Sequence, residues 1–340
     1  MIERLLDSAM DWAVLPGYTS LGYRARERLL PRGRIELAGH SVMLTGASAG
    51  IGEAACVAMA RAGARVHMVV RDPVRGEDAR ARVAEASGSD ALEVWLCDVS
   101  SLASVRELAA AFSERGEGLD VLVNNAGLLP AERTHTAEGF ELAFATNVLG
   151  PFLLTSLMLA ELRRAAPSRV INVSSGGMYT ARIDLDDLQL ESHPFDGARF
   201  YAHTKRAEVM LSEEWAARLA PEGIAVHSTH PGWVATPGVE SSLPRFNRVM
   251  GPLLRTPEQG ADTIVWLAGS EQGAGSGGEF WHDRRARPKH RVPWTRESAG
   301  ERRRLFEECE RLCGLGRGEA GGPPVSQPEA DAPPTGQKGA

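Results

Sequence analysis

The sequence predicts an α/β fold in which one doubly wound parallel sheet carries helices on both faces. Apolar runs of about five residues alternate with segments of helical periodicity, which is typical of parallel strands joined by helices. A glycine-rich turn separates the first apolar run from the first helical segment. Because crossovers between parallel strands are right-handed, ligands are expected beyond the carboxyl ends of the strands.

Six strands and five main helices are expected from this pattern. The apolar runs are Val42–Leu44, Arg65–Val70, Leu92–Cys97, Val121–Val123, Val170–Val173 and Ile224–Ser228. The segments of helical periodicity lie near residues 51–62, 74–86, 101–115, 136–165 and 201–220. They form a single α/β domain over residues 39–298, which follows an N-terminal helical arm over residues 1–38. A charged helix over 299–315 and a disordered tail over 316–340, rich in Gly, Pro and Ala, complete the chain.

The composition excludes several classes of protein. The chain has 340 residues, 43% of them hydrophobic, which is enough for a sizeable core. Its net charge of −6 and pI near 5.9 argue against a nucleic-acid partner. The four cysteines lack the spacing of a disulfide framework or a metal site: Cys56, Cys97, Cys309 and Cys313. We therefore expect a cytoplasmic protein that holds no metal.

The N-terminus does not have the pattern of a signal peptide, because Glu3, Asp7 and Asp11 interrupt its apolar residues. The apolar residues between 2 and 12 share one helix face, which we expect to pack on the domain or on a partner. The longest apolar stretch, Phe152–Leu162, has eleven residues and is too short to cross a bilayer. The sequence therefore predicts no transmembrane segment.

The glycine-rich turn, Thr45-Gly-Ala-Ser-Ala-Gly-Ile-Gly52, predicts a dinucleotide site of the Rossmann type. Gly46 permits the tight turn, Gly50 lets the backbone approach a pyrophosphate, and Gly52 lets helix and strand pack closely. Ile51 opens the helix, whose N-terminal N–H groups and dipole favour phosphate, and Ser48 can add a hydrogen bond.

The next strand end bears on the choice of nucleotide. Sites selective for NAD place a carboxylate there for the ribose 2′-hydroxyl, whereas this chain has Val70 followed by Arg71. A guanidinium suits a 2′-phosphate, so NADP is predicted and NAD is the alternative. Arg71 can instead be a solvated loop charge, with Asp72 as a helix cap.

Two further strand ends supply candidate nucleotide contacts. Asp98 and Val99 can reach an adenine edge, although Asp98 can equally cap the following helix. Asn125, Ala126 and Gly127 follow the fourth run, where small residues allow the backbone to approach the nucleotide. A purely structural role for Asn125, tying strand ends together, is an equal interpretation.

A tyrosine and a lysine supply the chemistry. Tyr201 and Lys205 are four residues apart and share one helix face. The nearby ammonium favours the phenolate, so Tyr201 can act as a general acid and base. Ser175 follows a predicted strand and can donate a hydrogen bond to a substrate oxygen.

The chain resembles the short-chain dehydrogenase/reductase family over about residues 38–285. The ordered motifs that carry the resemblance are the glycine-rich turn, Asn124-Asn-Ala-Gly127, Asn147, Ser174-Ser175, Tyr201-(x)3-Lys205 and Pro231-Gly232. His230-Pro-Gly-Trp233 and Ser174-Ser-Gly-Gly-Met178 are similar to one particular branch of that family.

The resemblance implies a small-molecule carbonyl or alcohol substrate and a nicotinamide cofactor. Tyr201 would be the acid and base, Lys205 its activator and ribose anchor, and Ser175, the second serine of its pair, the oxygen holder. Asn147 would support a proton relay through a water beside Lys205, unless it is only a polar residue inside a helix. The segment with Pro231, Gly232, Val234 and Thr236 would pass the nicotinamide end. A homo-oligomer is a further family-level expectation.

Four features depart from the common pattern or leave alternatives open. Ser175 and Tyr201 are 26 residues apart, longer than usual, so we expect a surface lobe with a solvated acidic cluster at Asp184, Asp186 and Asp187. Residues 238–256 offer an apolar cover that suggests a lipophilic substrate: Val239, Leu243, Phe246, Val249, Met250, Leu253 and Leu254. The basic run over 284–291 is expected to be a solvated loop. A nucleotide-sensing interaction protein with little turnover is the competing function, whereas hydrolysis and a catalytic histidine lack support.

Overall fold

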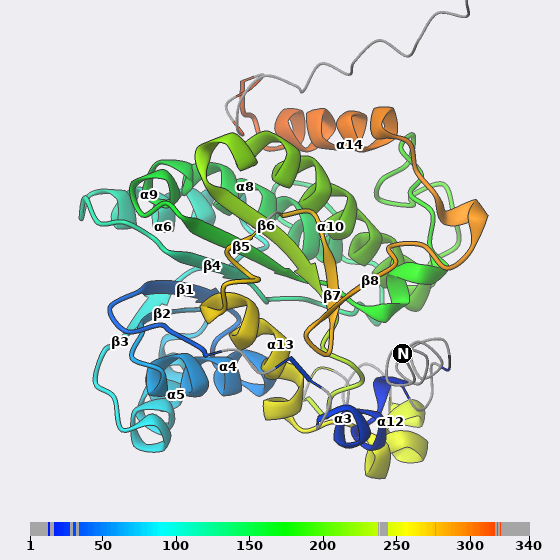
Figure 1. The fold of residues 1–340 in the computed structure, drawn as a ribbon. Helices are drawn as coiled ribbons and strands as arrows, with labels where there is room; N and C mark the ends of the chain where they lie inside the picture. Colours follow the sequence, from blue (N-terminus) through cyan, green and yellow to red (C-terminus); the bar gives the residue numbers. More distant parts are fainter. Residues whose placement is uncertain are drawn as a thin grey trace, which may run out of the picture.

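The computed structural model describes residues 13, 17–27, 30–31, 34–236, 238, 244–275, 277–316, 318 and 320. One sheet of eight strands runs through the centre, in the order β3-β2-β1-β4-β5-β6-β7-β8 (Figure 1). All neighbouring pairs are parallel except β7 and β8. The doubly wound parallel sheet expected from the sequence is therefore confirmed.

The strands follow the apolar runs closely. Their bounds are β1 Ser41–Thr45, β2 Arg65–Val70, β3 Leu92–Leu96, β4 Val121–Asn124, β5 Ser168–Val173, β6 Ile224–Thr229, β7 Phe280–His282 and β8 Arg285–Arg287. Every residue of β1, β4, β5 and β6 is buried, as expected for strands covered on both faces. The last two strands were not expected, because three residues each are too few to give a periodic signal.

Helices cover both faces of the sheet (Figure 1). One face carries α4 Gly50–Arg61, α5 Pro73–Ser87 and α13 Pro257–Gly269. The other carries α6 Leu102–Ser113, α8 Gly150–Leu157 and α10 Gly197–Leu219. Outside α10 lies α14 Ala299–Leu312, whose Phe306 ring is 4.7 Å from that of Trp215. No helix among the described residues is long and apolar enough to cross a membrane.

The prediction of a single helix over residues 136–165 is wrong. The helix begins only at Leu142, because Glu141 caps it by accepting a hydrogen bond from the Phe144 backbone. It then continues as α7 Leu142–Phe144, the π-helical turn η1 Ala145–Leu149, α8 and α9 Leu159–Arg164. A π-helical turn inside a helix is frequent at functional sites.

The N-terminal segment that includes α3 Ser20–Glu27 packs on the domain beside the β7–β8 turn (Figure 1). Arg26 of α3 donates a 2.7 Å hydrogen bond to the buried carboxylate of Asp283 in that turn. The backbone of Tyr18 accepts a hydrogen bond from Trp233 at 2.8 Å, which joins the segment to the loop after β6.

The basic run over residues 284–291 is not a solvated loop. Arg284 donates to Asp262 at 2.8 Å, Lys289 pairs with Glu213, and Arg287 is buried in β8. The charges of Arg284, Arg287 and Lys289, which the sequence alone assigned to solvent, therefore have a partner or a cover in the fold. Three sequence expectations lie outside the described residues: the helix face within 2–12, Val239 and Leu243 of the apolar cover, and the tail from residue 321 onward.

Candidate active site

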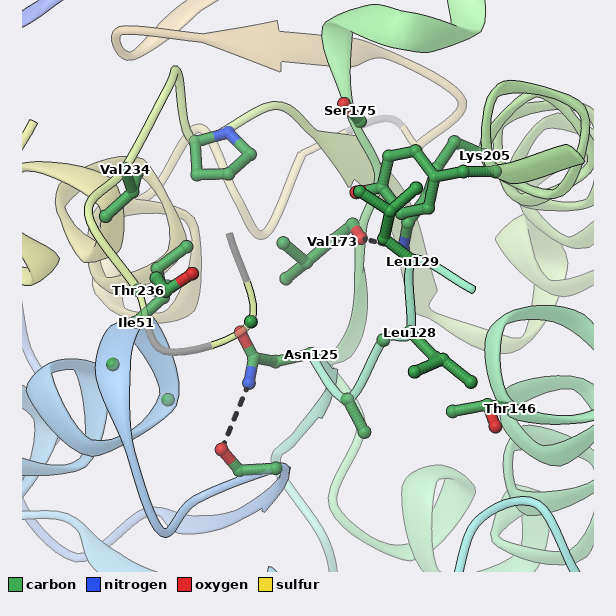
Figure 2. Close-up of a pocket in the computed structure, with 18 of the residues that line it drawn as sticks. Ile51, Asn125, Leu128, Leu129, Thr146, Val173, Ser175, Lys205, Val234 and Thr236 are labelled. Carbon is green, nitrogen blue, oxygen red and sulfur yellow. Dashed lines mark hydrogen bonds between the residues drawn. The ribbon is translucent and has the colours of Figure 1, made fainter. Parts of the chain in front are cut away.

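A cavity of about 800 Å³ lies at the carboxyl ends of the central strands. Of the site residues expected from the sequence, all but Asn147 line it: Gly46, Ser48, Gly50, Ile51, Gly52, Arg71, Asp98, Val99, Asn125, Ala126, Gly127, Ser175, Tyr201, Lys205, Pro231, Gly232, Val234 and Thr236. Figure 2 shows Ile51, Val234 and Thr236 on one side of the cavity and Lys205 on the other. The fold thus gathers residues from seven separate segments around one space.

The glycine-rich turn has the geometry that a bound pyrophosphate requires. Gly46 and Gly50 have positive φ angles of 71° and 57°, which favour glycine. A Cβ atom at Gly52 would lie 2.1 Å from the carbonyl oxygen of Gly46, so helix α4 can approach β1 only without a side chain there. The N-cap residue Ala49 makes no side-chain cap with any described group, which leaves the first N–H groups of α4 for an anion.

The ends of β2 and β3 place Arg71, the candidate for a 2′-phosphate, and Asp98, the candidate for an adenine edge, at the cavity. Arg71 is exposed at the rim of the cavity, and Asp72 caps α5 by accepting from Val74 and Arg75. Asp98 does not cap α6, because Ser101 occupies that position. Its carboxylate instead accepts from the Ser100 backbone and hydroxyl at 3.0 and 2.7 Å, while it also lines the cavity.

Asn125 has a structural role in addition to its place on the cavity wall. Its side-chain amide donates to the carbonyl oxygen of Thr45 at 2.9 Å and to that of Gly46 at 3.4 Å. The Thr45 hydroxyl in turn accepts from the backbones of Asn125 and Ala126, both at 3.0 Å. These bonds join the ends of β1 and β4 and fix the turn that faces the cavity.

Lys205 is held firmly at the far side of the cavity. Its Nζ donates to the carbonyl oxygen of Val173 at 3.0 Å (Figure 2) and to Glu208 Oε1 at 2.6 Å. The same Nζ lies 5.5 Å from the centre of the Tyr201 ring. Burial disfavours the ammonium, but the Glu208 carboxylate and Tyr201 outweigh it and raise the pKa of Lys205. Lys205 is therefore a charged group in contact with the phenol at neutral pH.

The two serines after β5 have different surroundings. Ser174 is buried and its hydroxyl donates to the backbone oxygen of Lys205 at 2.7 Å, so it ties β5 to α10. Ser175 is partly exposed on the cavity wall, where its Oγ accepts from the Gly177 backbone at 3.2 Å. Its O–H remains able to donate toward the cavity, which fits the role of holding a substrate oxygen.

Asn147 lies inside the π-helical turn, behind the cavity wall. Its Oδ1 accepts from the Leu128 backbone at 2.7 Å, and its Nδ2 donates to the Leu128 carbonyl and to Thr204, both at 2.9 Å. The side chain is completely buried. It therefore fixes the loop after β4 against α10, next to the helix turn that contains Lys205.

The substrate side of the cavity is mostly apolar, and the sequence indicated little of it. The wall residues that were missed are Leu128, Leu129, Leu142, Thr146, Gly177, Thr180, Ala198 and Ala202. Trp233 and Phe246 complete this wall, with ring centres 5.2 Å apart. Of the apolar cover expected from the sequence, Val249 is 73% exposed and Leu254 is buried away from the cavity, so neither covers a substrate.

His203 of α10 and His230, which follows β6, are not part of the cavity wall. His203 is buried and stacks on Phe200 with ring centres 6.4 Å apart, and burial lowers its pKa to about 4. His230 accepts from the backbones of Gly176 and Gly232 at 3.0 and 3.4 Å through Nδ1. It joins the loop that carries Ser175 to the loop after β6, a positioning role that its place in the motif His230-Pro-Gly did not indicate.

Comparison with known proteins shows which family and which proteins this chain is similar to. A family model described as short chain dehydrogenase matches residues 40–245. Dehydrogenase/reductase SDR family member 12 of Bos taurus is 39% identical over 300 residues, covering 87% of this chain and 93% of that protein. Retinol dehydrogenase 11 of Homo sapiens is 37% identical over 241 residues, covering 70% and 75%. The Pseudomonas aeruginosa RhlG/NADP active-site complex has a TM-score of 0.61 and 28% identity, covering 74% of this chain and 96% of that chain.

Proposed function

The chain belongs to the short-chain dehydrogenase/reductase family, and we propose that it interconverts a lipophilic carbonyl and its secondary alcohol with NADP(H) as the preferred cofactor. Its activity on CH–OH groups follows from the family and from its retinol dehydrogenase relatives. The motif His230-Pro-Gly-Trp233 indicated one branch of this family, and the similar bovine protein, dehydrogenase/reductase SDR family member 12, belongs to that branch. The observation that carries the proposal is the meeting of Ser175, Tyr201 and Lys205 at a cavity that also contains the glycine-rich turn.

The chemistry divides between the cofactor and the side chains. When bound, the nicotinamide supplies or accepts the hydride. Tyr201 gives a proton to the carbonyl oxygen or takes it from the alcohol, and Ser175 holds that oxygen by a hydrogen bond. Lys205 stabilises the phenolate that remains when Tyr201 has given its proton. Asn147 fixes the loop at Leu128 beside Lys205, and its part in a proton relay belongs to this proposal.

The preference for NADP is supported by charge at the rim of the cavity. Arg71 is exposed there, whereas no carboxylate stands at the end of β2. A guanidinium can make charge-assisted hydrogen bonds to a 2′-phosphate, as Lys and Arg do at other phosphate sites. The RhlG complex, whose structure contains NADP, is consistent with this choice.

The apolar wall supports a lipophilic substrate. Leu128, Leu129, Trp233 and Phe246 surround the space next to Ser175 and Tyr201 with few polar groups. Such a wall excludes water and strengthens the electrostatic interactions of the reacting groups. A cytoplasmic location and assembly into a homo-oligomer remain predictions from the cysteine composition and from the family.

Replacing the catalytic phenol tests the proposal. We expect Tyr201→Phe to lower kcat for a responsive carbonyl by about 10²- to 10⁴-fold, because the general acid is lost. Tryptophan fluorescence should show that NADPH still binds. Tyr23→Phe removes a phenol that does not line the cavity and is the matched control. Equal turnover by the Tyr201 variant and the parent would overturn the assignment, and tight NADPH binding without turnover on any carbonyl would favour the nucleotide-sensing alternative.

A further inference from the structure

An ion pair lies directly behind the catalytic lysine. Glu208 is one helical turn after Lys205 in α10, and its Oε1 accepts from Lys205 Nζ at 2.6 Å. Both side chains are nearly inaccessible to solvent, with exposed fractions of 4% for Lys205 and 8% for Glu208. Glu208 does not line the cavity, so it contacts the lysine from the side away from the substrate.

The pair determines which way the lysine can donate. An ammonium has three N–H groups, and among the described contacts two of them go to Glu208 and to the carbonyl oxygen of Val173. One donor therefore remains for the cavity side. The second carboxylate oxygen, Oε2, is buried and has no hydrogen-bond partner within the described structure, so Lys205 is the cation that the Glu208 carboxylate contacts.

The other groups near Glu208 and Lys205 do not disturb the electrostatic interaction between these two residues. Lys205 is the charged group that acts on Glu208, and Glu208 and Tyr201 are the groups that act on Lys205. Ser174, the residue after β5, contributes a neutral hydroxyl, and β5 contributes the neutral carbonyl group of Val173. Arg206, also on α10, pairs with Glu297 instead.

The remaining titratable residue on the neighbouring part of the sheet has its side chain on the opposite face. His227 of β6 accepts a hydrogen bond from Trp281 there, and burial lowers its pKa to about 4, so it adds no charge near the pair at alkaline pH. Burial also raises the pKa of Glu208 itself to about 7, against the opposing effect of Lys205. The carboxylate is therefore charged throughout the alkaline range.

We propose that Glu208 is a positioning residue and internal counter-ion that keeps the Tyr201–Lys205 pair fully protonated into the alkaline range, the form that can protonate a carbonyl oxygen. This inference rests on the proposed function. In this inference Glu208, a residue outside the cavity, controls the pH range in which carbonyl reduction proceeds.

The sign follows from charge alone. Lys205 Nζ lies 5.5 Å from the centre of the Tyr201 ring, so the charge of one group acts on the other and the test follows both groups together. A neighbouring carboxylate opposes the loss of either proton, because each loss removes a positive charge or creates a negative one beside it. Replacing Glu208 with neutral glutamine therefore moves the first alkaline ionisation to lower pH, whichever group loses the proton.

The direct test follows both groups in the full-length protein without nucleotide or substrate. Labelling with [13Cε]lysine and [13Cζ]tyrosine gives few NMR signals, because the sequence has only these lysines and tyrosines: Lys205, Lys289, Lys338, Tyr18, Tyr23, Tyr179 and Tyr201. In Glu208→Gln we expect the first alkaline ionisation of the pair to fall by about one pH unit. Circular dichroism checks that the variant is folded.

Two further variants separate charge from packing. Glu214→Gln removes an equally buried carboxylate from α10, the partner of Arg218, and should leave the titration of Lys205 and Tyr201 unchanged. Glu208→Asp keeps the charge, so its titration should stay closer to that of the parent than the titration of the glutamine variant does. If Glu208→Gln fails to fold, the aspartate variant still tests the proposal, since a shift as large as about one pH unit with the charge retained would contradict it.

Kinetics then test the catalytic consequence. The alkaline limb of kcat for carbonyl reduction should move to lower pH in Glu208→Gln and by the same amount as the NMR titration. An unchanged or upward-shifted ionisation overturns the counter-ion role, and a shifted titration with an unmoved kinetic limb overturns its link to catalysis. A protein that reduces no carbonyl would remove the proposed function, while the titration without substrate would still decide whether Glu208 controls the pair.

Discussion

Asp283 links the N-terminal segment, the β7–β8 turn and the loop after β6, and its replacement by asparagine tests how the site is held. Its carboxylate accepts from Arg26 at 2.7 Å and from Arg255 at 2.6 and 3.0 Å, with all three side chains almost wholly buried. Both guanidiniums also donate to the carbonyl oxygen of Gly17, at 3.1 and 2.9 Å. The backbone of Arg255 bonds to Trp233 and Ala235, so the same network fixes the loop that lines the cavity.

The expected loss of stability can be worked from this geometry. An asparagine in place of Asp283 would keep the shape of the side chain and tolerate the positive φ of 51° at this position, so the backbone contributes little to the change. The substitution would remove the negative charge and turn an amide N–H₂ toward a guanidinium, leaving two buried cations without a counter-charge. Breaking a buried pair from one side costs about 3–5 kcal/mol. We expect Asp283→Asn to lower the free energy of unfolding by about that amount.

Urea unfolding followed by circular dichroism measures this loss. Asp262→Asn is the matched control, because its partner Arg284 is closer to solvent, with side-chain exposed fractions of 18% for Arg284 and 13% for Asp262. That control should lose only about 1 kcal/mol. A loss below about 1 kcal/mol for Asp283→Asn would refute the argument, since the buried charges would then have found other compensation.

The pH dependence of the same measurement gives a second check. Burial would raise the pKa of Asp283, but His282 and the guanidiniums of Arg255 and Arg26 outweigh it and hold that pKa well below its ordinary value. A carboxyl whose pKa is lowered by folding stabilises fully above its unfolded pKa of about 3.9 and less as the pH falls below it. The difference in stability between parent and variant should therefore be constant above about pH 5 and shrink below about pH 4.

Two further predictions concern the nucleotide. Gly52→Ala should weaken NADPH binding by at least about tenfold in a tryptophan-fluorescence titration, because the new Cβ atom would meet the Gly46 carbonyl and displace α4 from β1. The control variant Gly88→Ala, at a helix end with open space around it, should bind NADPH normally. Equal NADPH affinities for Gly52→Ala and the parent would contradict the close-packing argument. Arg71→Ala should weaken NADPH binding by about tenfold and leave NADH binding nearly unchanged, as expected for one lost contact to a 2′-phosphate. An equal loss of affinity for both nucleotides would mean that Arg71 does not distinguish them.

Much of the fold could be predicted because its signals are local. The runs that became β2 and β5 are rich in Val, Ile and Met, and the spacing of the glycines in the glycine-rich turn is enough to indicate a nucleotide site. The cavity residues named by motif, such as Ser175 and Tyr201, lie at strand or helix ends whose positions follow from that pattern. Strand β7 could not be predicted, because it pairs with Ser228 and Thr229, which are some fifty residues away, and the short strand β8 pairs with β7 alone.

Contacts between distant segments were invisible for a different reason. Arg26 and Asp283 are 257 residues apart, and nothing near either residue indicates a buried partner. The sequence therefore predicts a separate arm over residues 1–38. In the structure, the described part of this segment helps to hold Trp233 at the cavity. Charged residues are mostly exposed, so a single charge in a sequence is interpreted as solvated unless its partner is known.

Helix α10 shows how this limit bears on catalysis. Its charged residues suggest a solvent-exposed face, yet Lys205, Arg206, Glu208, Glu214 and Arg218 are all buried. The sheet covers one side of the helix, and α14 covers the other (Figure 1), so each charge must find its partner inside the protein. The α14 segment lies beyond the region that matches the family model, which ends at residue 245. The burial of α10 thus depends partly on α14, whose Phe306 packs on Trp215 and Arg218, so a motif confined to residues 201–205 could not indicate that these charges are buried.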